Sequence, residues 1–141
     1  MRNCSYEERL KNWHDFRESL EHSSDPIFDV FNFYKEIPRV LIQTDPYDRE
    51  TWPDPWELIN ENIYCDFCIL LGMCYSLQLT DRFSGQDFEI YITQDREKSQ
   101  TNYLLFVNEW CLGYDIDKPI FRKDLPNSVT VEKAYTMNSL Q

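Results

Sequence analysis

The sequence contains few glycines, few histidines and no cluster of basic residues. Only three of its 141 residues are glycine, which excludes a glycine-rich loop of the kind that binds phosphate groups. Its two histidines, His14 and His22, both lie close to the start of the chain. A chemistry that needs histidine as a proton shuttle therefore has very few candidates here.

Positive charge is scarce as well. Lys and Arg number 14 against 25 Asp and Glu, so the formal net charge is -11, and no run of Lys or Arg occurs. A chain this acidic repels a phosphate backbone unless its basic residues cluster. We therefore expect no nucleic-acid binding, whereas assembly with basic protein partners fits this charge.

Long apolar runs are also absent. No stretch approaches the roughly 20 apolar residues that a membrane helix needs, so we expect no membrane insertion. Residues 1–8 lack the apolar core of a signal peptide, so we expect no secretion by that route. The odd number of cysteines, five, indicates a reducing compartment and free thiols.

The residues that are present suffice for one well-packed domain. The hydrophobic fraction is 42% and the aromatic fraction 16%, which supplies enough large apolar surface for a core. The length of 141 residues suits one domain and leaves little room for two.

The first part of the chain predicts two helices. Residues 5–22 carry an apolar residue every three or four positions: Leu10, Trp13, Phe16 and Leu20. Such a helix lies on the body of the protein or docks onto a partner. Asp25 and Pro26 predict the cap and first position of a second helix, which Pro38 ends. We expect Phe28, Phe31 and Tyr34 of this helix to face the core.

The middle of the chain predicts a loop and a central helix. Residues 39–43 suit a short strand or a buried extended segment. Residues 44–56 form a proline-rich loop with three aromatic anchors, Tyr47, Trp52 and Trp56. Asp54 and Glu57 then predict a capping box for a short helix that ends near Glu61. Residues 65–79 are apolar on nearly every side of a helix, which indicates a buried helix that begins near Cys65.

From residue 87 onward the pattern changes to the two-residue period of strands. Strands are predicted for residues 88–93, 102–107, 110–115 and 129–134, with a tight hairpin turn at residues 108–109. The predicted fold is therefore α+β, with N-terminal helices and a buried central helix packed on an antiparallel β meander. We expect an N-terminal helix that is a candidate docking arm (residues 1–24), a core (25–117) and a C-terminal extension (118–141).

One region of the sequence suggests a family. The segment from Trp52 to Ile59, followed by Cys65-Asp66-Phe67 and the buried helix, resembles the transglutaminase-like branch of the papain-like cysteine protease superfamily. The order of elements over roughly residues 26–117 fits this branch, and the compact acidic chain is similar to its small bacteriophage-encoded members.

This resemblance implies roles for three residues. Cys65 would be the nucleophile at the N-terminus of the central helix, where the helix dipole favours a thiolate. Asp115 matches the acid that orients the catalytic histidine, and the place of that histidine falls at or near Asn102. Asparagine forms hydrogen bonds but cannot shuttle a proton. The resemblance therefore implies a catalytically degenerate site at Cys65, Asn102 and Asp115.

Cys65 and Cys68 also form a C-x-x-C motif. A redox pair would be expected in a thioredoxin-like βαβ unit, which the pattern does not show. A zinc site needs four ligands, and Cys74 and Cys111 stand alone in the sequence. We therefore expect Cys68 to point into the core, and no metal or cofactor.

The sequence thus favours a non-catalytic structural or assembly protein on a transglutaminase-like scaffold. Its concrete form is a bacteriophage virion or morphogenesis component, in the host cytoplasm or the virion, with other proteins as partners. The alternative is a thiol hydrolase or acyltransferase with Cys65 as nucleophile, Asp115 as polarising group and Asn102 as an oxyanion or orienting donor. A small-ligand binding domain built on the aromatic loop of residues 47–56 is a third hypothesis.

Overall fold

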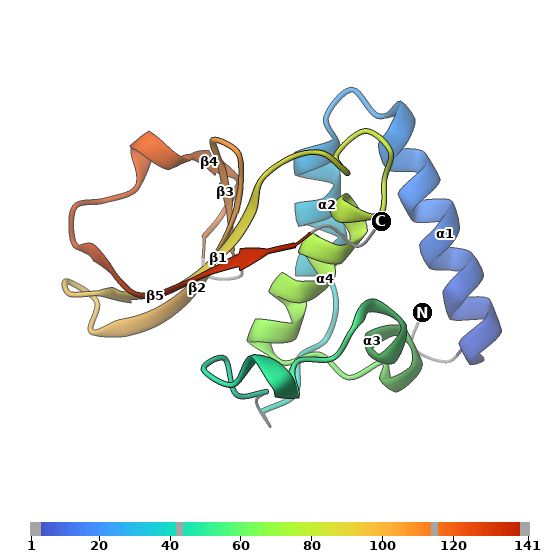
Figure 1. The fold of residues 1–141 in the computed structure, drawn as a ribbon, viewed down its shortest axis with the longest axis horizontal. Helices are drawn as coiled ribbons and strands as arrows, with labels where there is room; N and C mark the ends of the chain where they lie inside the picture. The colour runs from blue at the N-terminus through green and yellow to red at the C-terminus, as the bar shows by residue number, and fades with distance from the viewer. Residues whose placement is uncertain (1–3, 42–43, 114–115, 139–141) are drawn as a thin grey trace.

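The computed structural model describes residues 4–41, 44–113 and 116–138, and it is an α+β fold (Figure 1). Its four α-helices are α1 (Tyr6–His22), α2 (Pro26–Lys35), α3 (Pro55–Glu61) and α4 (Asp66–Gln78). Its five strands are β1 (Phe88–Asp95), β2 (Gln100–Val107), β3 (Trp110–Leu112), β4 (Ile120–Phe121) and β5 (Val129–Met137). Two short 3-10 helices lie at Arg49–Thr51 and Arg122–Asp124. The predicted α+β class is therefore confirmed.

The strands form one antiparallel sheet in the order β4-β3-β2-β1-β5. The β1–β2 register runs without interruption from Phe88 opposite Val107 to Asp95 opposite Gln100. Strands β1 to β3 form the predicted meander, and β4, which was not predicted, continues it beside β3. Strand β5 departs from it, because it returns along the other edge of β1 with a register shift at Ile92. The segment expected as an extension thus supplies β4 and β5.

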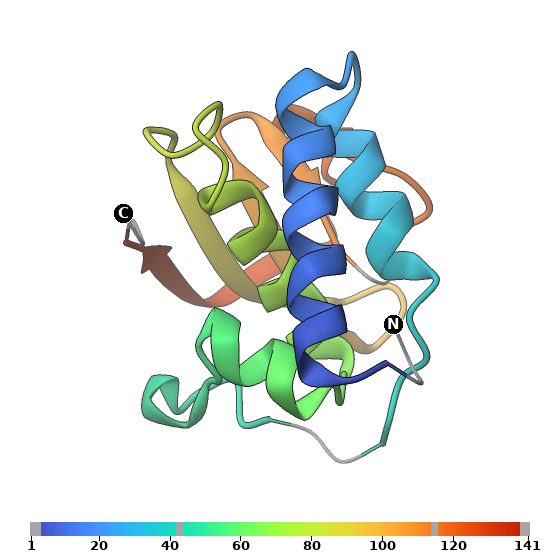
Figure 2. The same cartoon turned by 90° about the vertical axis from the view of Figure 1, so that its right-hand side faces the viewer.

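Helix α4 lies at the centre of the molecule, between the sheet and α1 (Figure 2). All its residues from Phe67 to Gln78 are buried, as its apolar character on all sides predicted. The helix begins after Cys65, which is its N-cap. Because α4 is enclosed on every side, the position of Cys65 is set by the packing of the whole domain.

The hydroxyl of Ser76 joins three helices. It accepts a hydrogen bond from Nε1 of Trp13 on α1 (2.8 Å) and lies 2.8 Å from the hydroxyl of Tyr34 on α2. Trp13, Tyr34 and Ser76 are all almost completely buried. Burial raises the pKa of Tyr34 to about 12, so its ring stays neutral under ordinary conditions.

Helices α2 and α4 approach most closely at Gly72. A methyl group at this position would lie 2.3 Å from Cε1 of Tyr34, much closer than side chains pack. Glycine is therefore required by the available space, since the Tyr34 ring occupies the volume of a side chain.

The apolar stripe of α1 is used inside the chain. Trp13 and Leu20 are buried in the main core, and Leu10 and Phe16 pack against that core. The hydroxyl of Ser5 caps the helix by accepting from the N–H of Glu8. The described structure thus places this stripe on the body of the protein.

Two local predictions near α2 are wrong, and a third is confirmed in part. Asp25 is the N-cap of α2 and Pro26 begins the helix, as predicted, but the side chain of Asp25 makes no capping hydrogen bond. Phe28 is only half-buried, whereas Phe31 and Tyr34 face the core as predicted. Residues 39–41 form no strand and are exposed, and the N–H of Val40 donates to the carbonyl of Tyr64. Residues 42–43 lie outside the described residues.

Several other local predictions are confirmed. The capping box of α3 forms, with Asp54 and Glu57 each accepting from the other's backbone N–H. Asn108 has a positive φ of 54° in the turn between β2 and β3, as expected for a tight hairpin. Strand β3 ends at Leu112, earlier than predicted, and residues 114–115 lie outside the described residues.

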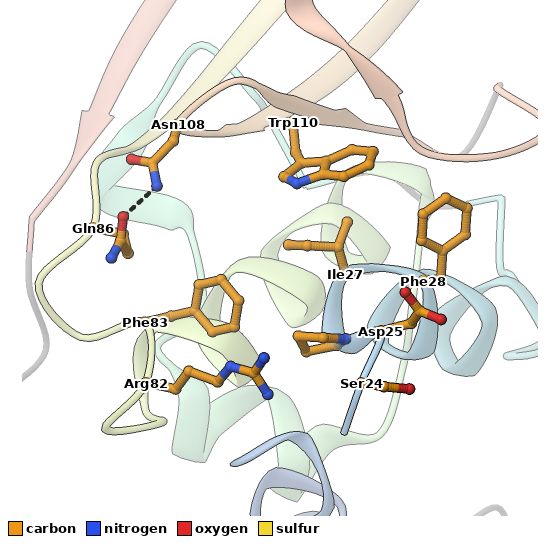
Figure 3. Close-up of a pocket in the computed structure, with 10 residues that line it drawn as sticks. Ser24, Asp25, Ile27, Phe28, Arg82, Phe83, Gln86, Asn108 and Trp110 are labelled. Atoms are coloured by element: carbon orange, nitrogen blue, oxygen red, sulfur yellow. Dashed lines mark hydrogen bonds between the residues drawn. The ribbon is translucent and has the colours of Figure 1, made fainter. Parts of the chain in front are cut away.

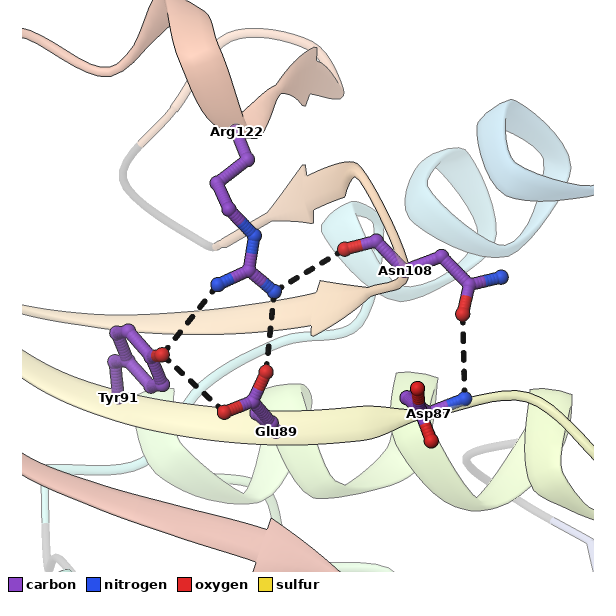
Figure 4. A network of polar contacts seen from close by, with 5 residues as sticks. All are labelled: Asp87, Glu89, Tyr91, Asn108 and Arg122. Carbon is purple, nitrogen blue, oxygen red and sulfur yellow. Dashed lines mark hydrogen bonds and ion pairs between the residues drawn. The ribbon is translucent and has the colours of Figure 1, made fainter.

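The far side of the sheet is closed by the segment after β3. Arg122 donates to Glu89 (3.1 Å) and to the carbonyl of Asn108 (3.1 Å), and its guanidinium carbon lies 4.1 Å from the ring centroid of Phe106 (Figure 4). The hydroxyl of Tyr91 completes this network by donating to Glu89. Arg122 therefore pins the segment of residues 116–128 to β1 and β2.

Among the described residues, no helix has both the length and the apolar character that a membrane span requires.

Replacing Gly72 by alanine should destabilise the fold strongly. The new methyl group forces the ring of Tyr34 away from α4 and strains its bond to Ser76. We expect Gly72→Ala to lower the free energy of unfolding by about 2 kcal/mol or more, despite the better helix propensity of alanine. Urea denaturation followed by far-UV circular dichroism measures this change.

Gly85→Ala is the matched control, since a methyl group there meets nothing within 4 Å. We expect its unfolding midpoint to stay close to that of the wild type. Equal destabilisation by both substitutions would contradict the assigned close contact of α2 and α4.

Candidate functional site around Cys65

The end of one helix and the start of the next place Cys65. Helix α3 ends at Asn62, whose left-handed φ of 54° turns the chain sharply. Asparagine accepts this conformation more readily than most residues. Three residues later, Cys65 is the N-cap of α4. The backbone N–H of Cys68, which has no partner within the helix, donates to the side chain of Cys65. The site therefore follows from local turn and cap chemistry.

Three hydrogen-bonding contacts surround the two cysteines. The sulfur of Cys65 accepts from the backbone N–H of Cys68 and from the backbone N–H of Thr44, both at 3.4 Å. The sulfur of Cys68 lies 3.3 Å from the hydroxyl of Thr44. Thr44 thus contacts both sulfurs, and it comes from the loop before α3.

This environment favours the thiolate of Cys65. The hydrogen bond from the thiol of Cys68 is the largest cause, and together with the backbone N–H groups of Thr44 and Cys68 it lowers the pKa of Cys65 to about 5, against the opposing effect of burial. The same interaction raises the pKa of Cys68, and burial adds to that rise. The pair therefore shares one proton, with the charge on Cys65 and the hydrogen on Cys68.

The site is closed to large molecules. Cys65 is 2% exposed and Cys68 is 4% exposed. Tyr64 is also buried beside them, and its hydroxyl has no hydrogen-bond partner among the described residues. At the mouth, Arg39 forms an ion pair with Asp66 at 2.5 Å, which leaves the first turn of α4 without a free carboxylate.

The structure does not bring Asn102 to Cys65. Side chains alternate along β2, and Leu105 and Val107 lie in the core beneath the helices while Leu104 and Phe106 lie in the cluster on the other face. Because the β2 register has no bulge, Asn102 shares the face of Leu104. There it accepts a hydrogen bond from Nε2 of Gln100 at 2.8 Å.

Tyr103 occupies the helix-facing position next to Asn102. Its ring lies 5.3 Å from that of Phe67, edge to face, in the first turn of α4. The predicted partner Asp115 lies outside the described residues. Of the three residues singled out from the sequence, the described structure therefore places only Cys65 in a chemically perturbed environment.

Sequence reasoning missed two parts of this site. Cys68 lies in the core, as expected, but its sulfur also interacts with Cys65 and Thr44, which was not expected. The C-x-x-C spacing at a helix N-terminus was the signal that could have revealed it, because residues three apart share a helix face. No local pattern marks Thr44, which is distant in sequence and arrives through the fold.

The remaining thiols differ from this pair. Burial raises the pKa of Cys74 and raises that of Cys111 to about 12, so both stay protonated. Within the part of the chain that the structure describes, no three side chains of His, Cys, Asp or Glu gather as metal ligands. The arrangement around Cys65 is thus a dithiol without a neighbouring histidine.

A hollow lies at the end of α4 opposite to Cys65, between the start of α2, the loop after α4 and the β2–β3 turn (Figure 3). It has a volume of about 470 Å³, and Phe28, Phe83 and Trp110 form much of its wall. Arg82 borders it, but the guanidinium donates to the carbonyls of Leu20 and Ser23. This hollow therefore presents aromatic surface without a free charged group from Arg82.

No protein-family model matches this sequence, and no curated protein is significantly similar to it. Membership of the transglutaminase-like branch therefore stays a prediction.

Selective alkylation should reveal the thiolate of Cys65. With a small neutral reagent such as iodoacetamide, we expect its reaction rate to rise with a midpoint near pH 5 rather than at the value of about 8.5 for an ordinary thiol. Cys68→Ala removes the largest stabilising donor, so the midpoint should move up by roughly one pH unit or more. The native protein is alkylated for set times, and peptide mass spectrometry then measures the extent of alkylation at each cysteine.

Cys4→Ser is the control for a thiol remote from the pair, and it should leave the Cys65 midpoint unchanged. A midpoint of about 8.5 in the wild type, or one that Cys68→Ala does not move, would contradict the assigned hydrogen bond between the two sulfurs.

Proposed function

We propose that this chain is a non-catalytic binding or assembly module built on a transglutaminase-like scaffold. The observation that carries the proposal is the residue facing the central helix from β2. Tyr103 stands there with its ring against Phe67, and Asn102 points to the opposite face of the sheet. A transglutaminase-type reaction needs a base beside the thiol, and general base catalysis contributes on the order of 100-fold to 10,000-fold in rate.

An exposed apolar patch supports a binding role. Leu41 is 95% exposed and Ile63 is 56% exposed, and with Val40 they form what we call the 40/63 patch. Val40 and Ile63 line one hollow of about 310 Å³. Exposed apolar residues that gather in one place typically mark an interaction site.

Charge indicates the chemistry of the partner. The chain has a formal net charge of -11, and the exposed acids Glu36 and Glu61 flank the 40/63 patch in sequence. Arg39, the basic residue next to the patch in sequence, forms an ion pair with Asp66. A protein that presents an apolar surface inside a basic rim would complement this face.

The resemblance to small bacteriophage-encoded members of the family supports a virion or morphogenesis component as the concrete form of this module. On that proposal the chain acts in the host cytoplasm or in the virion, and its partners are other assembly proteins.

A thiol hydrolase or acyltransferase is the second candidate, and the lowered pKa of Cys65 favours it. Such a site would still need a proton donor for the leaving group, and Cys68 is the nearest protonated group. Its raised pKa makes Cys68 a poor acid. The backbone N–H groups that would bind an oxyanion are also occupied by the sulfur itself.

Site-specific photo-crosslinking tests the assembly proposal. A benzophenone amino acid replaces Ile63 in one variant and Val131 of β5 in another, because these residues are 56% and 54% exposed. In cells that naturally make the protein, we expect one discrete adduct from position 63 and none from position 131. The adduct should weaken as salt rises, since charge complementarity is screened.

Two further substitutions decide between the candidate functions. Leu41→Asp should reduce the adduct at position 63 about tenfold, because it places a charge in the apolar contact. Cys65→Ala should leave the adduct unchanged. Equal adducts from positions 63 and 131 would overturn the binding surface, and loss of the adduct in folded Cys65→Ala would favour thiol chemistry.

A further inference from the structure

Cys65 and Cys68 are one helical turn apart and share a single partner. Cys65 caps α4, and Cys68 lies three residues later on the same helix face. Thr44 bonds the first sulfur through its N–H at 3.4 Å and contacts the second through its hydroxyl at 3.3 Å. Both sulfurs therefore converge on one small space beneath Thr44.

The spacing of the two residues suits a disulfide bond. Residues one turn apart in a helix have Cα atoms about 5 Å apart, which lies within the range that disulfides span. A bond between them would close a very short loop at the helix terminus. The two sulfurs lie 3.4 Å and 3.3 Å from the backbone nitrogen and the hydroxyl of Thr44, so they are already held close to each other.

We propose that Cys65 and Cys68 are a redox-active dithiol that small peroxides oxidise to an intramolecular disulfide. Our sequence reasoning set redox chemistry aside because no βαβ unit precedes the motif. Physically, the helix N-terminus matters more than the preceding strand, because the dipole and free N–H groups stabilise the thiolate. Helix α4 supplies that terminus with Cys65 at its cap.

The reaction has two balanced steps. The thiolate of Cys65 attacks one oxygen of the peroxide and the O–O bond breaks, which gives a sulfenic acid and a hydroxide or alkoxide ion. Cys68 then attacks the sulfenic sulfur, the S–O bond breaks, and water leaves with the thiol proton of Cys68. The dithiol loses two electrons, and the hydroxide or alkoxide ion takes a proton from solvent. Hydrogen peroxide is thus reduced to two water molecules, and an alkyl hydroperoxide to water and an alcohol.

Burial selects the class of oxidant. The two sulfurs are only 2% and 4% exposed, which hinders a protein or glutathione disulfide that must align three sulfur atoms. Hydrogen peroxide and small alkyl hydroperoxides are compact and need to contact only one sulfur, so burial hinders them less. Cys74 and Cys111 stay protonated and completely buried, so they do not compete.

Oxidation should occur at this pair alone. On adding a small excess of hydrogen peroxide to the reduced full-length protein near neutral pH, we expect the peptide that holds Cys65 and Cys68 to become lighter by two hydrogens. Dithiothreitol should restore it. Peptide mass spectrometry after blocking of the remaining thiols identifies the bond, and circular dichroism reports whether each variant is folded.

Single substitutions separate the roles of the two cysteines. Cys68→Ser should stop the reaction at the sulfenic acid, which dimedone traps on Cys65. Cys65→Ser should lower the oxidation rate of Cys68 at least about tenfold, because the thiolate is lost. Cys4→Ser is the control and should form the same disulfide as the wild type.

Three results would overturn the proposal. These are wild-type protein without a Cys65–Cys68 bond once the peroxide is consumed, oxidation spread evenly over the cysteines, and an unchanged rate in folded Cys65→Ser. The first two use only the wild type, so they hold even where a variant fails to fold. None of them depends on whether the 40/63 patch binds a partner.

Discussion

The hydrogen bonds of the Ser76 hydroxyl are the constraint on which the described structure depends. This one oxygen holds the indole of Trp13 and the phenol of Tyr34, so it fixes α1 and α2 against the central helix. A buried polar group left without a partner costs about 1–3 kcal/mol, which makes these three side chains a mutually dependent set. With α4 fixed in this way, the cap at Cys65 has a defined position at its end.

Local chemistry was predictable and long-range placement was not. The capping box of Asp54 and Glu57, the buried helix and the start of that helix at Cys65 all follow from short sequence patterns, and the structure contains each of them. The face of β2 could not be predicted as safely. A shift of one residue exchanges Asn102 and Tyr103 between the two sides of the sheet. Matching the sequence to the family pattern by position alone is not accurate to one residue. Thr44 could not be found because no pattern links a loop residue to a sulfur beyond α3.

The site shows how a thiolate can be stabilised without a histidine. In a catalytic pair the stabilising charge comes from imidazolium, which also delivers the proton. Here neutral donors, the thiol of Cys68 and the N–H groups of Thr44 and Cys68, take its place. They hold the negative charge, but the raised pKa of Cys68 makes it a poor acid for the leaving group of an acyl transfer. This electrostatic difference separates acyl transfer, which needs a proton donor, from reactions in which the sulfur only attacks a weak bond.

The pairing of β5 with β1 has a consequence for the order in which the chain folds. Strand β1 is flanked by β2, which follows it directly, and by β5, in which Met137 lies 49 residues after its partner Phe88. During synthesis, β1 therefore leaves the ribosome with one edge unpaired until residues 129–137 emerge. The helices and the β1–β2 hairpin are able to associate early, and the closure of that edge is the last event of folding. An exposed strand edge in the nascent chain makes this interval the period of greatest exposure to aggregation and to chaperones.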